Sequence, residues 1–489
     1  MRTLDRIRGH ASAAPGRAAY RAGNDVVTYG ELWERAENLA ALLRDLDARH
    51  TGRPSPGLPG PAPIALDGSR SPDTAVAMTA CLIAGIPYVP VAPSTPPARL
   101  ESMLRQSGAR LLLAADGFPD PGIKGLTVIP LKDIGKSACP RAAAGKEDAA
   151  CGTSRYAYII FTSGTSGEPK GVPVYRDSLD NFTGWMSSYP PLDGYREITV
   201  LNQALFSFDL SVAGFFYPLA CGHTVAAFRS EDELAAVLPE TDAAVMTPSF
   251  LRMLLLDGDF RAERFPRLKC VWLCGEVLTP AAARQALNAF PDLTLINAYG
   301  PTEACCAVCA VRITGEDTEK PGPLPVGELS SAAAGIAVED GEIVLRGKSV
   351  FGGYLDGSEG GHFREDGTDG YRTGDTGWSE NGLLFCSGRK DRQVKYKGYR
   401  IELSDIEANI SDLPGVTGCA AATRRRADGE ISAIRAFVTV SDPRLTEAAL
   451  KRRLAGSLPD YMIPKVIRII DRMPVTENGK TDIKKLETL

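Results

Sequence analysis

A segment rich in glycine and hydroxyl side chains follows the apolar run Tyr156–Phe161 and carries a lysine near its end. Residues 162–171 read TSGTSGEPKG. Backbone N–H groups, hydroxyls and an ammonium group on a flexible loop can surround a polyphosphate. The segment differs from a Walker A loop, because Pro169 stands where that motif requires a glycine before the lysine. We therefore expect a phosphate-binding loop of another kind, with a solvated turn as the alternative.

Three more segments carry side chains that suit a nucleotide. Residues 297–303, NAYGPTE, follow an expected strand and offer a tyrosine for a base, a threonine for phosphate and a glutamate that can hold Mg²⁺. Asp375 suits a pair of ribose hydroxyls, and Arg389 suits a phosphate or a ribose. Lys480 lies in the turn NGKTD near the C-terminus. A lysine on such a turn is usually solvated, so it gains a role only if a small domain brings it to the cleft.

Short apolar runs alternate with amphipathic stretches, which predicts an α/β fold with mainly parallel sheet. The expected strands are Leu111–Ala114, Tyr156–Phe161, Ala243–Met246, Lys269–Leu273 and Leu293–Asn297. The expected helices are Glu31–Leu46, Ser249–Leu256 and Pro280–Phe290. Short strands and glycine-rich turns become frequent around and beyond Tyr354, as at Gly341–Arg346 and Gly382–Cys386, before strands and helices alternate again at Leu403–Ile410, Ala433–Val440 and Glu447–Leu454. His50–Pro63 and Ala142–Cys151 read as loops.

The charge distribution divides the chain near Asp391. The 489 residues carry a net charge of −5, which gives no argument for nucleic-acid binding. Residues 391–489 contain 18 basic and 14 acidic residues, whereas residues 1–390 are net acidic. We therefore expect a large N-terminal domain at 1–390 and a small mobile α+β domain at 391–489. The basic excess of the small domain suits an acidic partner, and a chance surface bias is the alternative.

Neither the N-terminal residues nor the longest uncharged stretch predicts export or a membrane span. The N-terminus, MRTLDRIRGHASAAPG, lacks the apolar core of a signal peptide. Thr74–Ala98 contains no charged residue, but prolines and Gly85 interrupt it, so a buried helix followed by a strand is expected rather than a membrane span. The 11 cysteines, an odd number, indicate free thiols in a reducing cytoplasm.

The four motifs, in this order and at these separations, resemble those of the adenylate-forming enzymes, a superfamily that includes acyl-CoA synthetases, luciferases and adenylation domains of nonribosomal peptide synthesis. Three further segments match the same family, namely VTYGEL at 27–32, AGIPYVP at 84–90 and the stretch from QVK to GYRIEL at 393–403. The resemblance covers nearly the whole chain. It implies that a carboxylate attacks the α-phosphate of ATP, that pyrophosphate leaves, and that a thiol then takes the acyl group from the adenylate.

The resemblance also assigns catalytic roles. It implies that Lys480 bridges the substrate carboxylate and the phosphate while the adenylate forms, that Thr302 contacts phosphate, and that Glu303 helps to hold Mg²⁺. Asp391 matches the hinge about which the C-terminal domain rotates, after which Gly398 and its loop line the approach of the thiol. The implied ATP-binding residues are Thr162, Ser163, Gly164, Thr165, Ser166, Lys170, Asn297, Ala298, Tyr299, Gly300, Asp375 and Arg389. Among these, the tyrosine packs on adenine and the aspartate binds the ribose hydroxyls.

Residues 204–211, ALFSFDLS, resemble the pattern of amino-acid adenylation enzymes, in which the aspartate pairs with the α-ammonium group of the substrate. Here that residue is Asp209, and a buried charge needs such a partner. The alternative is that Asp209 caps a helix expected at Leu210–Leu219.

Several segments look like those of D-alanine–carrier protein ligases, namely NFT at 181–183, LNQA at 201–204 and CGEVL at 274–278. In that family the cysteine lies beside the α-carbon of the substrate and helps to set stereochemical preference, a role that the resemblance carries to Cys274. The alternative is a small buried strand residue. The implied lining of the amino-acid site is Phe208, Asp209, Leu210, Ala213, Met246, Trp272, Cys274, Gly275, Ala298, Cys306 and Ala307.

The sequence also departs from that ligase pattern. AGFF at 213–216 replaces a methionine–aspartate pair, Cys305–Val308 replaces β-branched and small residues, and Trp272 is bulky enough to narrow the pocket. Because Asp209 is the only charged residue in the implied lining, we expect a small apolar amino acid, with D-alanine first. L-Alanine, glycine and L-proline are alternatives, and a natural-product (antibiotic) pathway is as plausible as teichoic acid modification.

The chain has no carrier-like attachment site after the Lys480 motif, so a stand-alone enzyme is expected. Its partner would be a separate carrier protein with a phosphopantetheine arm. The basic runs Arg424–Arg426 and Lys451–Arg453 suit an acidic carrier, and a solvated face is the alternative. Two rival functions remain, a CoA ligase for a carboxylic acid, which leaves Asp209 unexplained, and a non-catalytic nucleotide-binding module.

Overall fold

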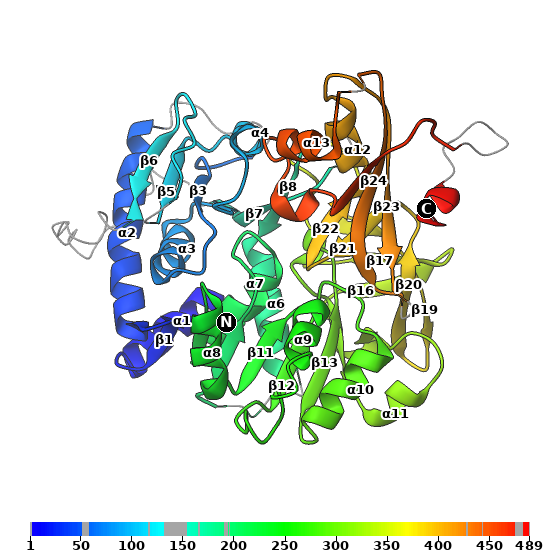
Figure 1. Ribbon diagram of the computed structural model, residues 1–489. Coiled ribbons are helices and arrows are strands. Elements are labelled where there is room, and N and C mark those ends of the chain that lie inside the picture. Colours follow the sequence, from blue (N-terminus) through cyan, green and yellow to red (C-terminus); the bar gives the residue numbers. More distant parts are fainter. Residues whose placement is uncertain are drawn as a thin grey trace.

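Two mostly parallel sheets form the large domain of the computed structural model (Figure 1). The structure describes residues 2–50, 58–115, 118–131, 154–164, 167–189, 194, 196–426, 429–442, 444–474 and 483–488. Thr165, Ser166, Lys480, the loop expected at Ala142–Cys151 and residues 51–57 of the one expected at His50–Pro63 lie outside these ranges.

The first sheet is parallel except at its two edges. Its strands are β1 (Ala18–Ala22), β2 (Asp25–Thr28), β9 (Thr199–Asn202), β10 (Thr224–Ala227), β11 (Ala243–Met246), β12 (Cys270–Leu273), β13 (Thr294–Tyr299) and β14 (Cys309–Ile313). They lie in the order β14-β13-β12-β11-β9-β10-β1-β2, with the edge strands β14 and β2 antiparallel to their neighbours. In a parallel sheet the strand ends collect at one edge, which is where α/β proteins place ligands.

The second sheet repeats this design. It contains β3 (Ile64–Asp67), β4 (Tyr88–Val91), β5 (Leu111–Ala114), β6 (Thr127–Pro130), β7 (Tyr156–Thr162) and β8 (Lys170–Tyr175). The order is β6-β5-β3-β4-β7-β8, and only β8 runs antiparallel. The antiparallel turn between β7 and β8 carries the glycine-rich segment 163–169 to the end of the sheet.

Helices fill the space between the two sheets and cover their outer faces. The helices of the large domain are α1 (Thr3–Ala13), α2 (Tyr29–His50), α3 (Pro72–Ala84), α4 (Pro97–Ser107), α6 (Arg176–Ser188), α7 (Leu210–Ala220), α8 (Glu231–Val237), α9 (Pro248–Leu255), α10 (Pro280–Ala289) and α11 (Gly315–Glu319). The largest core contains residues of α3, α6 and α7 together with both sheets. A second core joins α8, α9 and α10 to the opposite face of the first sheet. In Figure 1, α2 runs along the left edge of the molecule.

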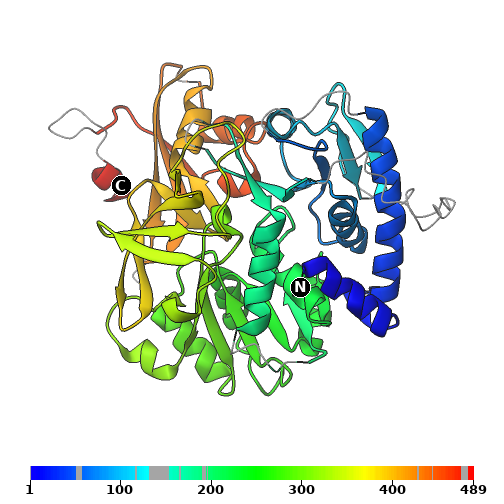
Figure 2. The same ribbon diagram turned by 180° about the vertical axis from the view of Figure 1, so that it is seen from behind.

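A third, antiparallel sheet connects the large domain to the C-terminal domain. It contains β15 (Gly327–Glu328), β16 (Gly335–Glu339), β17 (Glu342–Arg346), β18 (His362–Glu365), β19 (Thr368–Glu380) and β20 (Leu383–Arg389). Figure 2 shows it in yellow between the green strands of the first sheet and the orange C-terminal strands. Asp391 lies between β20 and the next strand, so the chain leaves this sheet at that residue.

The C-terminal domain has a core of its own, which begins at Val394. Its elements are the hairpin β21 (Gln393–Tyr396) and β22 (Tyr399–Glu402), then α12 (Leu403–Ser411), β23 (Val416–Arg425), β24 (Ile431–Val440), α13 (Glu447–Leu454), β25 (Val466–Ile469) and α14 (Ile483–Thr488). The strands β23, β24 and β25 form one sheet, and α12 and α13 pack on one of its faces. The expected α/β large domain and small α+β domain are therefore both present.

Most predicted elements agree with the structure to within two or three residues. Leu111–Ala114 and Ala243–Met246 match β5 and β11, and the uncharged stretch Thr74–Ala98 forms most of α3, then β4, as expected. The long helix begins at Tyr29 rather than Glu31, because the Glu31 carboxylate accepts hydrogen bonds from the backbone N–H and hydroxyl of Thr28 in a capping box. No helix in the described ranges is long and apolar enough to cross a membrane.

The C-terminal domain packs against the cleft edge of the large domain. The buried side chains of Arg99 on α4 and Asp405 on α12 approach to 3.4 Å. Arg252 on α9 pairs with Glu430, which precedes β24. Figure 1 shows α12 and α13 beside α4 and β8 at the top of the molecule. These contacts hold the hairpin β21–β22 over the ends of the parallel strands.

Candidate active site

The turn between β7 and β8 meets the C-terminal domain. The Ser163 hydroxyl donates to the carbonyl oxygen of Arg400 at 2.9 Å and accepts from the N–H of Glu402 at 2.7 Å. At Gly164 an added Cβ would lie 2.1 Å from the carbonyl oxygen of Glu168, so only glycine fits there. Lys170 Nζ lies 5.3 Å from the ring centre of Tyr354. This part of the expected phosphate loop is therefore tightly folded and faces β22.

Glu303 lies in a short 3₁₀ turn after β13 and is fully buried. Its carboxylate pairs with Arg400 from β22 and accepts a hydrogen bond from the Tyr354 hydroxyl. Burial acts to raise its pKa, but the charge of Arg400 and the Tyr354 hydrogen bond outweigh burial, and the pKa is lowered. The group is thus an ionised carboxylate of the kind that Mg²⁺ prefers, and it fits that ion once Arg400 has moved away.

Asp375 is held at the end of an antiparallel ladder between β19 and β20. Its two oxygens accept from the Tyr299 hydroxyl at 2.6 Å and from Arg389 Nη1 at 2.7 Å. Arg389 also bonds both oxygens of Asp391, at 2.7 and 2.8 Å. The structure thus brings together the residues expected at ribose, base and hinge. The guanidinium of Arg389 therefore connects Asp375 to Asp391.

Two of the expected ATP-binding residues have packing roles of their own. The Asn297 side chain donates to the carbonyl oxygen of Pro325 at 2.8 Å and is buried. A Cβ at Gly300 would lie 2.5 Å from the Cα of Ala307. Glycine therefore lets the strand end approach the turn at 305–307, in which Cys305 and Cys306 both have positive φ angles of 60° and 75°. Consecutive non-glycine residues in that region are strained, a feature that recurs at functional sites.

Asp209 stands at the first turn of α7 and is buried beside Thr302 and Glu303. Asp209 occupies the N-cap position of α7, as the alternative expected, but its side chain makes no capping hydrogen bond to the helix. Burial raises its pKa to about 6, although a hydrogen bond with the Thr302 side chain acts to lower it. Among the described residues no cation forms an ion pair with this carboxylate.

Cys274 and Cys306 face each other beside Asp209. Cys274 Sγ lies 3.8 Å from the carbonyl oxygen of Cys306. A hydrogen bond with the Cys274 thiol and burial both raise the pKa of Cys306. Ala298, Ala307, Leu210 and Ala213 belong to the same large core cluster as the two cysteines.

Trp272 is a buried residue of β12 close in sequence to Cys274. It precedes Cys274 by two residues on the same face of β12, and its side chain is 1% exposed. Its ring meets Trp185 and Tyr189 edge-on, each at a centroid distance of 5.8 Å. The indole is therefore buried in an aromatic cluster two residues before Cys274.

Met246 lies on the other face of the sheet, in the second core with Leu273, and not with Cys274. The neighbouring Thr247, which sequence reasoning missed, follows β11 as the N-cap of α9 and lies beside Gly398. Its methyl group would lie 2.9 Å from a Cβ at Gly398. A one-residue shift moves a strand side chain to the opposite face, which explains the difference.

The hairpin β21–β22 enters the site between these groups. The N–H of Gly398 donates to Glu276 Oε1 at 2.6 Å, and Phe208 packs against Tyr399. Lys395 Nζ lies 5.7 Å from the ring centre of Tyr299. Glu276, Lys395 and Arg400 were not among the expected site residues, although the motif at 393–403 marked their hairpin. Gly398 is thus held against Glu276, Thr247 and Phe208.

Comparisons with known proteins agree with this geometry. A family model described as "AMP-binding enzyme" matches residues 7–355, and one described as "AMP-binding enzyme C-terminal domain" matches residues 405–480. The chain belongs to the adenylate-forming (AMP-binding) enzyme family, whose members are ATP-using ligases.

Individual relatives show which members of this family the chain resembles. The chain is 34% identical to D-alanine–D-alanyl carrier protein ligases of Bacillus licheniformis and Bacillus velezensis, over at least 99% of both chains in each case. A solved NRPS protein containing adenylation and PCP domains is 25% identical, with a TM-score of 0.81 over 99% of this chain and 84% of that one. A Vibrio cholerae adenylation domain solved with glycyl-adenosine-5′-phosphate, 21% identical, has the same fold, with a TM-score of 0.80 over 99% and 97% of the two chains.

Proposed function

We propose that this protein activates a small amino acid, with D-alanine as the first candidate, and transfers it to the phosphopantetheine thiol of a separate carrier protein in the cytoplasm. The observation that carries the proposal is the buried carboxylate of Asp209. Among the described residues no cation forms an ion pair with it, although the charges of Lys395 and Arg400 reach it, so the α-ammonium group of an amino acid would complete it. A CoA ligase for a simple carboxylic acid offers no such group.

The size of the site supports a small side chain. Trp272, supported by Trp185 and Tyr189, leaves little depth below the paired thiols of Cys274 and Cys306. We assign Cys274 to the α-carbon of the substrate, where its size would influence the choice between D- and L-isomers. Full-length similarity to D-alanine–D-alanyl carrier protein ligases supports the same substrate class.

The chemistry divides between the two domains. Asp375 and Tyr299 would hold the ribose and base of ATP, and Lys480 would neutralise the reacting carboxylate and phosphate. Bound Mg²⁺ would supply charge neutralisation on the phosphates, held through Glu303. The observed hairpin position supports the second step, because Gly398 then borders the route to the amino-acid site.

The experiment that tests this proposal is amino-acid-dependent exchange of labelled pyrophosphate into ATP. The panel is D-alanine, L-alanine, glycine, D-serine, L-serine, L-proline and L-valine. We expect the strongest exchange with D-alanine. A stronger signal with another member would keep amino-acid activation and reject D-alanine. Silence across the panel, with turnover of carboxylic acids and CoA, would reject amino-acid activation.

Trp272→Leu should enlarge the substrate range. Removing the indole opens space under Cys274, so we expect the ratio of valine to alanine exchange to rise at least about tenfold, while the cavity lowers stability by about 2–4 kcal/mol. Phe290→Leu is the control, because Phe290 is equally buried but belongs to the second core. Equal changes of substrate ratio in both variants would contradict the assignment of Trp272 to the pocket.

A further inference from the structure

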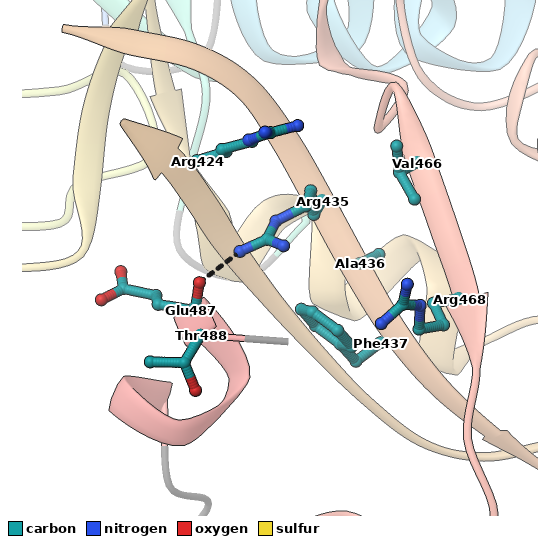
Figure 3. Close-up of a pocket in the computed structure, with 8 residues that line it drawn as sticks. All are labelled: Arg424, Arg435, Ala436, Phe437, Val466, Arg468, Glu487 and Thr488. Carbon is teal, nitrogen blue, oxygen red and sulfur yellow. Dashed lines mark hydrogen bonds between the residues drawn. The ribbon is translucent and has the colours of Figure 1, made fainter. Parts of the chain in front are cut away.

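A cavity of about 350 Å³ lies in the C-terminal domain, on the sheet of β23, β24 and β25 (Figure 3). It has no part in the site described above, because its lining comes from these strands and from α14. Figure 3 shows Arg424, Arg435 and Arg468 on three neighbouring strands, with Glu487 on the helix opposite.

The strand register explains why the arginines gather there. Arg424 pairs with Ala433, Arg435 with Val466, and Arg468 with Phe437. Residues 433, 435 and 437 alternate along β24 and therefore share one face, so their cross-strand partners share it too. The opposite face, with Ile434 and Val438, is covered by α12 and α13. Of the described helices, α14 lies on the arginine face, where its Leu486 packs in one cluster with Phe437.

The charges in this pocket are not balanced. Arg435 Nη2 donates to the carbonyl oxygen of Glu487 at 2.7 Å, but its Nε is buried and lacks a hydrogen-bond partner in the described structure. Burial and the charges of Arg424 and Arg468 all lower the pKa of Arg435. The surroundings therefore disfavour the positive charge on the Arg435 guanidinium. Among the described residues of the lining, Glu487 alone carries a carboxylate. An anion that accepts from these guanidiniums would relieve this repulsion.

The pocket also has an apolar side, formed by Phe437 and Val466. The Arg435 guanidinium lies 5.5 Å from the centre of the Phe437 ring, so the cationic and apolar surfaces adjoin. An inorganic phosphate would leave most of a 350 Å³ cavity unfilled, whereas pockets of this size accommodate small organic ligands. The lining therefore matches a ligand with a phosphate at one end and a ring or short chain at the other.

We propose that this pocket, lined by Arg424, Arg435, Arg468, Phe437, Val466 and Glu487, binds a small organic phosphate. The phosphate faces the guanidiniums, which suit it as planar donors, and the organic part lies against Phe437 and Val466. This site is independent of the amino-acid activation proposed above.

Calorimetric titration of the full-length protein with phenyl phosphate tests the site, with inorganic phosphate and phenol as separate probes. We expect one equivalent of phenyl phosphate to bind at least tenfold more tightly than inorganic phosphate, with no detectable binding of phenol. Equal affinity for phenyl phosphate and inorganic phosphate would contradict the proposed contact of an organic group with the apolar side. No binding of phenyl phosphate at millimolar concentration would contradict the existence of the site. The assay needs neither ATP nor an amino acid, so its result is separate from that of pyrophosphate exchange.

Arg424→Gln is the diagnostic variant, because the Arg424 side chain, unlike that of Arg435, carries no hydrogen bond to α14 in the described structure. It should weaken phenyl phosphate binding at least tenfold. Arg452→Gln, with the same change of charge on α13 at the opposite face, should change it less than twofold. Equal weakening would assign binding to the general positive charge, and undiminished binding in Arg424→Gln would assign it to another site; either result overturns the proposal.

Discussion

Asp209→Asn should reduce kcat/KM for amino-acid activation by about 150- to 5,000-fold, which corresponds to the 3–5 kcal/mol typical of removing one partner from a buried ion pair. Asparagine keeps the size of the side chain but cannot pair with an α-ammonium group. Pyrophosphate exchange across a range of amino-acid concentrations measures the effect. The loss should be much smaller for the corresponding acid without the amino group, so the variant should discriminate poorly between alanine and propionate. Wild-type kinetics in Asp209→Asn would reject the ammonium pairing.

The raised pKa of Asp209 predicts that amino-acid activation depends on pH. Burial raises the pKa of Asp209 to about 6, so below that pH the carboxylate is protonated and cannot pair with the ammonium group. In wild-type protein kcat/KM should therefore fall by about tenfold per pH unit below about pH 6. The Asp209→Asn variant should lack this acidic limb. A profile that is flat from pH 5 to pH 7 in wild-type protein would contradict the assignment.

The Asp209→Asn substitution should raise the stability of the protein, although it lowers activity. Because the pKa of Asp209 is about 6 in the folded protein and about 3.9 in the unfolded chain, the folded state binds the extra proton between these values. The free energy of unfolding therefore falls as the pH rises from about 4 to about 6 and remains lower above it. Asp209→Asn should raise the free energy of unfolding at pH 7 by on the order of 2 kcal/mol. Thermal denaturation without ligands measures it.

Asp405→Asn is the matched control for stability. Burial also raises the pKa of Asp405 to about 6, but this carboxylate has the buried Arg99 as its partner. Asparagine there leaves the guanidinium without a counter-charge, so Asp405→Asn should lower the melting temperature, whereas Asp209→Asn should raise it. A fall in both variants would mean that Asp209 has a structural partner after all.

Gly398→Ala should separate the two half-reactions. We expect loading of the carrier protein to fall by about 10- to 100-fold, while pyrophosphate exchange changes less than about threefold. Gly398 has a φ of 83°, and an added Cβ would lie 2.9 Å from the Thr247 methyl group and 3.4 Å from the Phe208 ring. The methyl group therefore opposes the hairpin position that brings Arg400 to Glu303 and Gly398 to the amino-acid site. Adenylate formation, assigned to an arrangement with Lys480 in the cleft, does not need that position.

Two further variants distinguish this clash from general strain. Gly382→Ala adds a methyl group at a φ of 79° with no atom within 4 Å, so it should affect neither half-reaction. Thr247→Ser removes the clashing methyl group but keeps the hydroxyl that caps α9, so it should restore loading when combined with Gly398→Ala. Failure of this rescue, or equal loss of exchange and loading in Gly398→Ala, would contradict the proposed role of the hairpin.

Local patterns in the sequence were enough to predict most helices and strands and the polar residues that follow the strands. Apolar runs such as Leu111–Ala114 form strands as predicted. The spacing of apolar residues and the length of the run depend only on residues adjacent in the sequence, so they can be recognised without the fold. The motif residues Glu303 and Asp375 were identifiable because their chemistry is carried by residue type and by position after a strand. The boundary of α2 was missed by two residues because its capping box involves side-chain geometry.

Only the tertiary structure decided which of these residues share a surface. It placed Met246 on the far face of the first sheet and Thr247 in the site, a choice set by one residue of register. It gave Glu303 the cation Arg400, 97 residues away, and left Asp209 without a capping bond. It also gathered three arginines from three strands around one cavity. The physical reason is that burial and charge pairing depend on contacts distant in sequence, which composition and spacing do not encode.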